Sequence, residues 1–237
     1  MNRSAANHLD GILLVDKPAD WTSFDVVHFV QRHFRLDKTG HCGTLDPFAT
    51  GLLVILLGKA TRLQDSLMSQ HKIYTGTLRL GEETDSGDLT GNPTTRREVP
   101  ELSLAQLQQA ADTFLGDILQ TPPMHSAIKI NGQPLYKLAR KGREIERPAR
   151  PVHIERFELR NLRLPDVDFE VHCSKGTYIR TLGVDLGTKV GCGAHLTALR
   201  RIASGQHRVE NAVTVDQLKS WDLAALAAQI EPLAENA

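Results

Sequence analysis

The sequence predicts an α+β fold with a largely antiparallel mixed sheet flanked by helices. Residues 72–80 alternate between apolar and other side chains, which is typical of a strand, whereas residues 26–34 carry the apolar spacing of a helix that faces a core. Along the chain, hairpins dominate over regular strand–helix alternation. With 237 residues, 41% of them hydrophobic, the chain can form one large domain or two small ones.

The N-terminal half begins with a short buried strand at residues 11–17, which a Lys-Pro turn ends. A helix begins at residues 22–25, with Ser23 as its expected cap, and runs to Phe34. The further expected elements, in order, are a buried strand at 52–57, a helix at 59–68, a strand at 72–80, an acidic turn at 82–88 and a helix at 102–115.

The C-terminal half contains one strand-to-helix junction of interest, where a glycine turn leads into a helix whose first turn carries Tyr178 and Arg180. Free backbone N–H groups at a helix start favour anions, so these two side chains are candidates for a binding site. The other expected elements are a strand at 126–130, a turn at 131–132, a helix at 135–141, two antiparallel strands within 152–171, a strand at 196–202 and two short helices after it.

Composition excludes several classes of protein. The sequence holds no apolar run of the roughly 18 residues that a membrane helix needs, and its start lacks the apolar core of an export signal, so we expect a cytoplasmic protein. Cys42, Cys173 and Cys192 are far apart and form no C-x-x-C pair. A disulfide framework or a zinc knuckle is therefore not expected.

Charge is balanced overall but not along the chain. The 28 Lys and Arg equal the 28 Asp and Glu, which argues against a non-specific nucleic-acid binder. Residues 129–163 nevertheless hold ten basic and four acidic side chains, a local charge of +6. From residue 205 onward, two basic and five acidic side chains give −3. This polarity is compatible with a basic groove and an acidic tail, or simply with solvated faces.

The most informative stretch is residues 41–51, where Asp46 lies between a Gly-Thr-Leu run and a proline. An Asp-Pro pair favours a turn, and the apolar run that follows predicts a buried strand. A carboxylate on a rigid turn beside a core strand is suited to meet a substrate, although such turns are also common in ordinary loops. Tyr74 and Arg180 have equally ordinary interpretations when each is taken alone.

Six segments together resemble the TruB family of pseudouridine synthases, in the family's order and over residues 9–215. The resemblance implies a pseudouridine synthase catalytic fold for residues 9–215, between a disordered tail at 1–8 and a short helical tail at 216–237, without the RNA-binding PUA barrel of many relatives. The segments are GILLVDKPADWTS (11–23), GHCGTLDPFATG (40–51), KIY (72–74), DSGD (85–88), KGTYIRTL (175–182) and LTALRR (196–201).

The resemblance also assigns roles to individual residues. Asp46 resembles the catalytic aspartate, Arg180 the arginine that pairs with it and keeps it ionised, and Tyr74 the ring that stacks on the flipped uracil. The expected substrate-binding residues are His41, Lys17, Tyr178 and Leu199. The candidates for further RNA contacts are Lys129, Lys137, Arg140, Lys141, Arg143, Arg200 and Arg201.

The implied reaction is isomerisation of uridine to pseudouridine, at U55 in the T loop of tRNA. The N-glycosidic bond breaks, the uracil rotates, and a carbon–carbon bond forms through C5, by C6 addition, C1′ attack or glycal formation. No redox change, group transfer or hydrolysis occurs, so no cofactor and no metal is expected. The expected partner is the T stem-loop of tRNA; we expect a monomer that needs no protein partner and no membrane.

The sequence departs from the family pattern at two places, and three alternative functions stay open. Cys42 stands where the family usually has threonine, which raises a thiol or metal site, and residues 19–21 replace a glycine-containing turn. One alternative is a tRNA-binding or folding module without chemistry, and another is a synthase for a different RNA. A glycoside hydrolase would need a second carboxylate, for which Asp85 or Asp88 is the nearby candidate.

Overall fold

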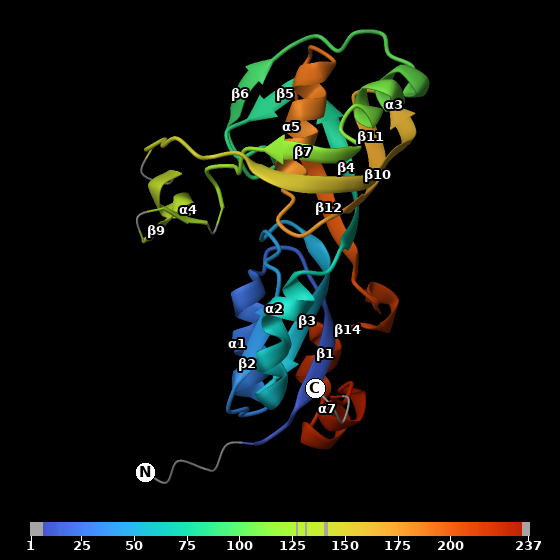
Figure 1. Ribbon diagram of the computed structural model, residues 1–237. Helices are drawn as coiled ribbons and strands as arrows, with labels where there is room; N and C mark the ends of the chain where they lie inside the picture. Colours follow the sequence, from blue (N-terminus) through green and yellow to red (C-terminus); the bar gives the residue numbers. More distant parts are fainter. Residues whose placement is uncertain (1–6, 127, 131, 140–141, 234–237) are drawn as a thin grey trace. The chain divides into compact units, whose positions relative to one another are not determined.

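The computed structural model describes residues 7–126, 128–130, 132–139 and 142–233 (Figure 1). The chain forms two compact units, of which unit 1 comprises residues 1–74 and 200–237 and unit 2 comprises residues 75–199. The strands β4 (Lys72–Leu80) and β12 (Ala194–Ser204) carry the chain from one unit to the other. The helices and mostly antiparallel strand pairs confirm the predicted α+β class.

Unit 1 is built on an apolar strand pair that is buried on both faces. β1 and β3 run antiparallel, with β2 on β3 and β14 parallel to β1. β12 joins β3 in parallel, through the pairs Arg200–Thr50 and Arg201–Gly51, and β13 pairs with β12. The bounds of these strands are β1 Gly11–Lys17, β2 Thr39–Cys42, β3 Thr50–Leu57, β13 His207–Arg208 and β14 Val213–Thr214.

The helices of unit 1 cover both faces of this pair, which explains why β1 and β3 read as continuous apolar runs. Alternate residues such as Leu13 and Val15 pack with α1, α6 and α7, while Ile12 and Leu14 pack toward η1, η2 and β2. The bounds are α1 Ser23–His33, η1 Gly58–Leu63, α2 Gln64–Met68, η2 Val209–Asn211, α6 Val215–Ser220 and α7 Leu223–Gln229.

Unit 2 contains the strand order β12-β4-β11-β10-β7, with helix α3 held against β10. The Gln108 amide of α3 donates to Phe157 O at 2.7 Å and accepts from Leu159 N at 2.8 Å. Two small hairpins, β5/β6 and β8/β9, lie outside this sheet. The bounds are β5 Glu82–Thr84, β6 Pro93–Arg96, α3 Leu104–Asp112, β7 Gly116–Gln120, β8 Lys129–Ile130, β9 Gln133–Pro134, α4 Leu135–Ala139, β10 Arg150–Arg163, β11 Asp166–Cys173 and α5 Ile179–Lys189.

Most predicted elements are confirmed, and the differences have local causes. Thr22, not Ser23, caps α1, because its side chain forms a reciprocal capping box with Asp25 while the Ser23 hydroxyl bonds elsewhere. The helix expected at 59–68 is a 3₁₀ turn followed by the short α2. Among the described residues of the strand expected at 126–130, Lys129–Ile130 form a strand, whereas Ser126 and Ile128 do not. Parts of the expected turn at 131–132 and of the helix at 135–141 lie outside the described residues.

The ends of the described chain belong to the core of unit 1. Leu218 of α6 and Leu226 of α7 are fully buried, so the segment expected as a helical tail is integral to this unit. Of the expected N-terminal tail, Asn7 is fixed by bonds to α1's C-terminal end, and residues 1–6 lie outside the described residues. Within the described residues, no helix is long and apolar enough to span a membrane.

Candidate active site

Asp46 lies on a tight turn between β2 and β3, as predicted. The Ala49 N–H donates to Asp46 O at 3.1 Å, which closes a four-residue turn with Pro47 at its second position, where proline is favoured. The Asp46 side chain is half-buried, and β3 begins at Thr50 directly after the turn. The sequence thus places a partly accessible carboxylate at the end of a buried strand.

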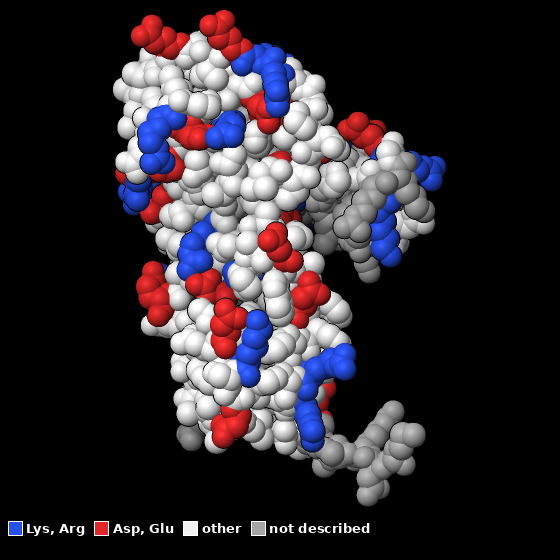
Figure 2. Space-filling view, turned by 180° about the vertical axis from the view of Figure 1, so that it is seen from behind, with Lys and Arg blue, Asp and Glu red and all other residues white. Residues whose placement is uncertain are grey.

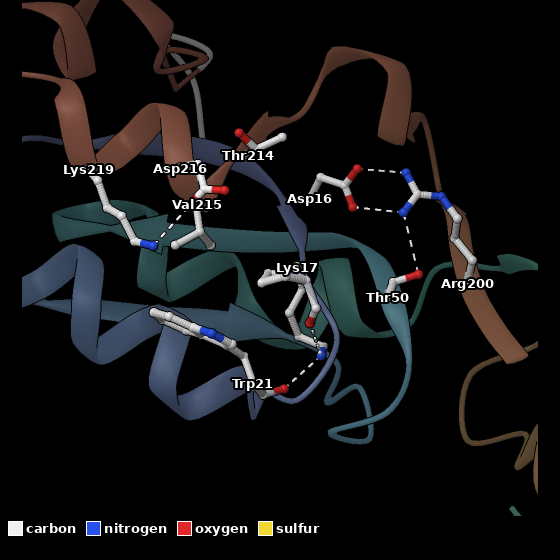
Figure 3. A pocket seen from close by; sticks show the side chains of 10 residues that line it. Asp16, Lys17, Trp21, Thr50, Arg200, Thr214, Val215, Asp216 and Lys219 are labelled. Carbon is white, nitrogen blue, oxygen red and sulfur yellow. Dashed lines mark hydrogen bonds and ion pairs between the residues drawn. The ribbon is translucent and has the colours of Figure 1, made fainter. Parts of the chain in front are cut away.

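Lys17 supports this turn through a hydrogen bond to its backbone. Its side chain is fully buried at the end of β1, and Nζ donates to Pro18 O at 2.8 Å and to Trp21 O at 2.7 Å (Figure 3). Nζ also donates to Pro47 O at 3.1 Å. Burial lowers the pKa of Lys17 to about 8, and the negative charge of Asp46 acts in the opposite direction. The ammonium therefore attracts the Asp46 carboxylate and ties the turn to β1.

The two adjacent arginines at the end of β12 have different environments. Arg200 is half-buried and makes a bidentate ion pair with Asp16, at 2.9 Å and 2.6 Å, beside a pocket of about 450 Å³ (Figure 3). Arg201 is 1% exposed, and it donates to Leu52 O at 2.7 Å and Gly43 O at 3.1 Å. The structure does not support Arg201 as an RNA contact, because its guanidinium is buried in protein.

His41 and Cys42 precede the turn on β2. Burial lowers the pKa of His41, and the nearby Arg201 charge lowers it further, so the imidazole is neutral at pH 7. Cys42 is fully buried, and burial raises the pKa of its thiol to about 11. A protonated thiol is neither a nucleophile nor a metal ligand. The described part of the chain contains no group of three or more His, Cys, Asp or Glu that could hold a metal ion.

Tyr74 is half-buried on β4, at the last residue of unit 1 before the chain enters unit 2. The start of this strand is fixed by Lys72, whose buried Nζ donates to Met68 O at 2.6 Å and Gln70 O at 2.5 Å. These carbonyls lie at the C-terminal end of α2, where a positive charge is favourable. Tyr74 is therefore presented from an anchored strand.

Arg180 occupies the second position of α5 in unit 2 and is 4% exposed. Its guanidinium donates to Ser86 O at 3.0 Å and His125 O at 2.6 Å, and its Nη1 lies 3.5 Å from Asp88 Oδ2. Asp88 is itself fixed by Thr90, whose N–H and hydroxyl donate to Oδ1 at 2.9 Å and 2.5 Å. Sequence reasoning considered Asp88 only as a second acid; its place in the DSGD segment is the signal that could have linked it to Arg180.

The remaining predicted residues of unit 2 are placed as follows. Tyr178 is the N-cap residue of α5, and the Gln120 amide brackets its backbone, accepting from Tyr178 N at 2.7 Å and donating to Tyr178 O at 3.1 Å. Leu199 is 7% exposed on β12. Lys137 and Arg143 are exposed. The Lys129 side chain and the residues Arg140 and Lys141 are outside the described structure.

The basic run at 129–163 is largely neutralised on its strand portion. Arg160 pairs with Glu158 at 2.9 Å and with Glu170 of β11 at 3.3 Å, and Arg156 contacts the same two acids. Arg163 pairs with Asp168 of β11 at 2.8 Å. Figure 2 shows basic side chains lying next to acidic ones over the visible face. The sequence count missed these partners because β11 supplies acids across the strand pair.

Comparison with known proteins places the fold in one class. A model described as "TruB family pseudouridylate synthase (N terminal domain)" matches residues 31–179, and one described as "tRNA pseudouridylate synthase B C-terminal domain" matches residues 180–236. The class that these matches define is the pseudouridylate synthases. Within that class, the chain belongs to the TruB family.

Individual relatives agree with this assignment. The tRNA pseudouridine synthase B of Opitutus terrae is 47% identical over 229 residues, which cover 97% of this chain and 95% of the relative. That of Bordetella avium is 46% identical over 222 residues, covering 93% and 91%. Among solved structures, a chain of a Cbf5-Nop10-Gar1 complex matches with a TM-score of 0.73 and 30% identity. That match covers 94% of this chain, which spans 60% of the solved one.

Proposed function

We propose that this protein isomerises uridine to pseudouridine in tRNA, and that its target is U55 in the T loop. The observation that carries the proposal is the half-buried Asp46, held on a closed turn between β2 and β3, within a family of pseudouridylate synthases. Relatives named tRNA pseudouridine synthase B, at 44–47% identity, support tRNA as the substrate. The choice of U55 rests on the motif resemblance.

One carboxylate is enough for this chemistry, because no water molecule has to be activated. The ionised Asp46 carboxylate makes glycosidic bond cleavage possible, by whichever of the three routes the reaction follows. Tyr74 stacks on the extruded uracil and assists removal of the C5 proton. The motif resemblance assigns to Arg180 the role of keeping the aspartate ionised, and the buried Lys17 provides a positive charge near Asp46 from within unit 1.

The substrate has to leave its stack to reach Asp46, and the remaining residues are assigned to that step. His41, as a neutral ring on β2, fills the place that the target nucleotide leaves. Tyr178 and Leu199 line the uracil site, and the exposed Lys137 and Arg143 contact phosphates. The protein acts as a monomer on tRNA in the cytoplasm, without a protein partner.

The test uses an unmodified tRNA transcript and maps pseudouridine by carbodiimide-block primer extension. Conversion at position 55 by the wild type but not by Asp46→Asn supports the reaction, the target and the acid together. Asp65→Asn, which changes an exposed carboxylate on α2, is the matched control and keeps full activity. Bound but unmodified tRNA would instead indicate a binding module, and conversion of other uridines alone would refute the assignment of U55.

A further inference from the structure

The turn that carries Asp46 is held at every second residue, at Gly43, Leu45 and Pro47. Each of these three backbone positions accepts a hydrogen bond from a different buried side chain. On the N-terminal side, Arg201 Nη2 donates to Gly43 O at 3.1 Å. Because β12 brings Arg201 to the turn from far along the sequence, this contact is a tertiary one.

Ser23 and Lys17 hold the two residues that flank the aspartate. Ser23 Oγ accepts from Leu45 N at 2.8 Å and donates to Leu45 O at 3.3 Å, and thus uses both of its hydrogen-bonding functions on one residue. Lys17 Nζ donates to Pro47 O at 3.1 Å. Asp46 lies between these two fixed points, so its backbone has little freedom to shift along or across the turn.

The three holding side chains are themselves buried and anchored. Ser23 is 1% exposed in the first turn of α1, Arg201 is 1% exposed and also donates to Leu52 O, and Lys17 also donates to Trp21 O. Burying polar and charged groups is unfavourable unless they are hydrogen-bonded, and apolar side chains would fill the same space at lower cost. Directed hydrogen bonds differ from apolar packing in that they fix the backbone in one position.

We propose that Ser23 and Arg201 are positioning residues for the isomerisation: with Lys17, they hold the turn so that the Asp46 carboxylate meets the reacting atom of the uridine at reacting distance. This inference rests on the proposed function, because it takes Asp46 as the reacting acid. Neither residue touches the substrate, since both are buried in protein. Misplacement of a reacting group by about 1 Å can lower a rate about 100-fold. Loss of these hydrogen bonds to the turn should therefore have a measurable effect on the rate.

The first test separates positioning from stability. Ser23→Ala and Arg201→Met are compared with Leu226→Ala, which truncates a fully buried side chain in the same unit away from the turn. Single-turnover rates on saturating tRNA, tRNA affinity and Tm are measured for each. We expect the first two variants to lose about 10- to 100-fold in rate with unchanged affinity. We expect Leu226→Ala to have a lower Tm than the wild type but the same single-turnover rate. Equal rates in all folded variants would overturn the proposal.

A second readout works without catalysis. The Leu45 N–H is donated to Ser23, so its hydrogen exchange reports the state of the turn directly. Ser23→Ala and Arg201→Met should raise exchange at residues 43–49, and Leu226→Ala should not. If the wild type fails to modify tRNA, the proposed function is wrong, and unchanged exchange in the two variants would then separately refute the holding role.

Discussion

Replacing Gly51 by alanine should disrupt the junction of β3 and β12 that lies directly behind the Asp46 turn. Gly51 has a φ of +99°, which L side chains rarely adopt. A Cβ built at this position would lie 2.3 Å from Arg201 O and 2.9 Å from Arg201 N. Both obstacles are backbone atoms of the paired strand, so no side-chain rotation can relieve the clash.

The expected loss in the free energy of unfolding has two contributions. A non-glycine residue held in an unfavourable backbone region costs about 1–3 kcal/mol. Moving the two strands apart also weakens the pairing of Arg201 with Gly51, and each lost hydrogen bond costs about 1 kcal/mol. With one or two bonds lost, we therefore expect Gly51→Ala to lower the free energy of unfolding by about 2–5 kcal/mol.

Urea unfolding followed by circular dichroism measures this difference. Gly40→Ala is the matched control, because Gly40 lies on the neighbouring strand β2, where an added Cβ would meet only the Thr61 methyl carbon, at 3.8 Å. The control should change stability by less than about 1 kcal/mol. A loss below about 1 kcal/mol for Gly51→Ala would show that the strands can separate freely and would refute the rigid junction.

Three further outcomes are expected. Between pH 8 and 10.5 Lys17 is protonated in the unfolded chain but deprotonated in the folded one, so its contribution makes stability rise with pH. The single-turnover rate should fall above about pH 8, because a neutral amine can donate at most two of the three hydrogen bonds of Lys17. The pH profiles of unfolding and of the single-turnover rate check this, and both effects should be absent in Lys17→Met. Asp88→Asn removes the charge beside Arg180 and should slow single turnover about 10-fold at unchanged tRNA affinity. Asp85→Asn is the control and should keep its rate, because the Asp85 carboxylate accepts hydrogen bonds from Asn92 in the exposed loop. Equal rates in the two variants would contradict the role of Asp88. Iodoacetamide should leave the native enzyme active because the Cys42 thiol is buried and protonated, and rapid inactivation lost in Cys42→Thr would disprove this.

The sequence was sufficient to predict the fold class and most strands and helices, because their signals are local. The apolar run of β3 and the Asp-Pro turn before it depend on neighbours in the sequence. For α1 the sequence predicts a cap one residue too late, since Thr22 and Ser23 are both residues that cap helices well. Only the structure shows that the Ser23 hydroxyl is already used by Leu45, a residue 22 positions away.

Burial and pairing across strands could not be predicted. Arg200 and Arg201 are equal in the sequence as basic residues, yet strand geometry turns consecutive side chains to opposite faces. One therefore meets Asp16 at the rim of a pocket, and the other enters the core beside Gly43. The net charge of residues 129–163 likewise gives no sign that Glu170, on the paired strand, forms ion pairs with Arg156 and Arg160.

The discontinuity of unit 1 sets an order of events during synthesis. Its first part ends at Tyr74, and its second begins at Arg200. At about 5–20 residues per second, the intervening stretch takes a ribosome roughly 6–25 seconds to make. During that time β1 and β3 lack α6, α7 and β12, and the Asp46 turn lacks the guanidinium that holds Gly43. The hydrogen bonds that hold the Asp46 turn are thus complete only when nearly the whole chain has left the ribosome.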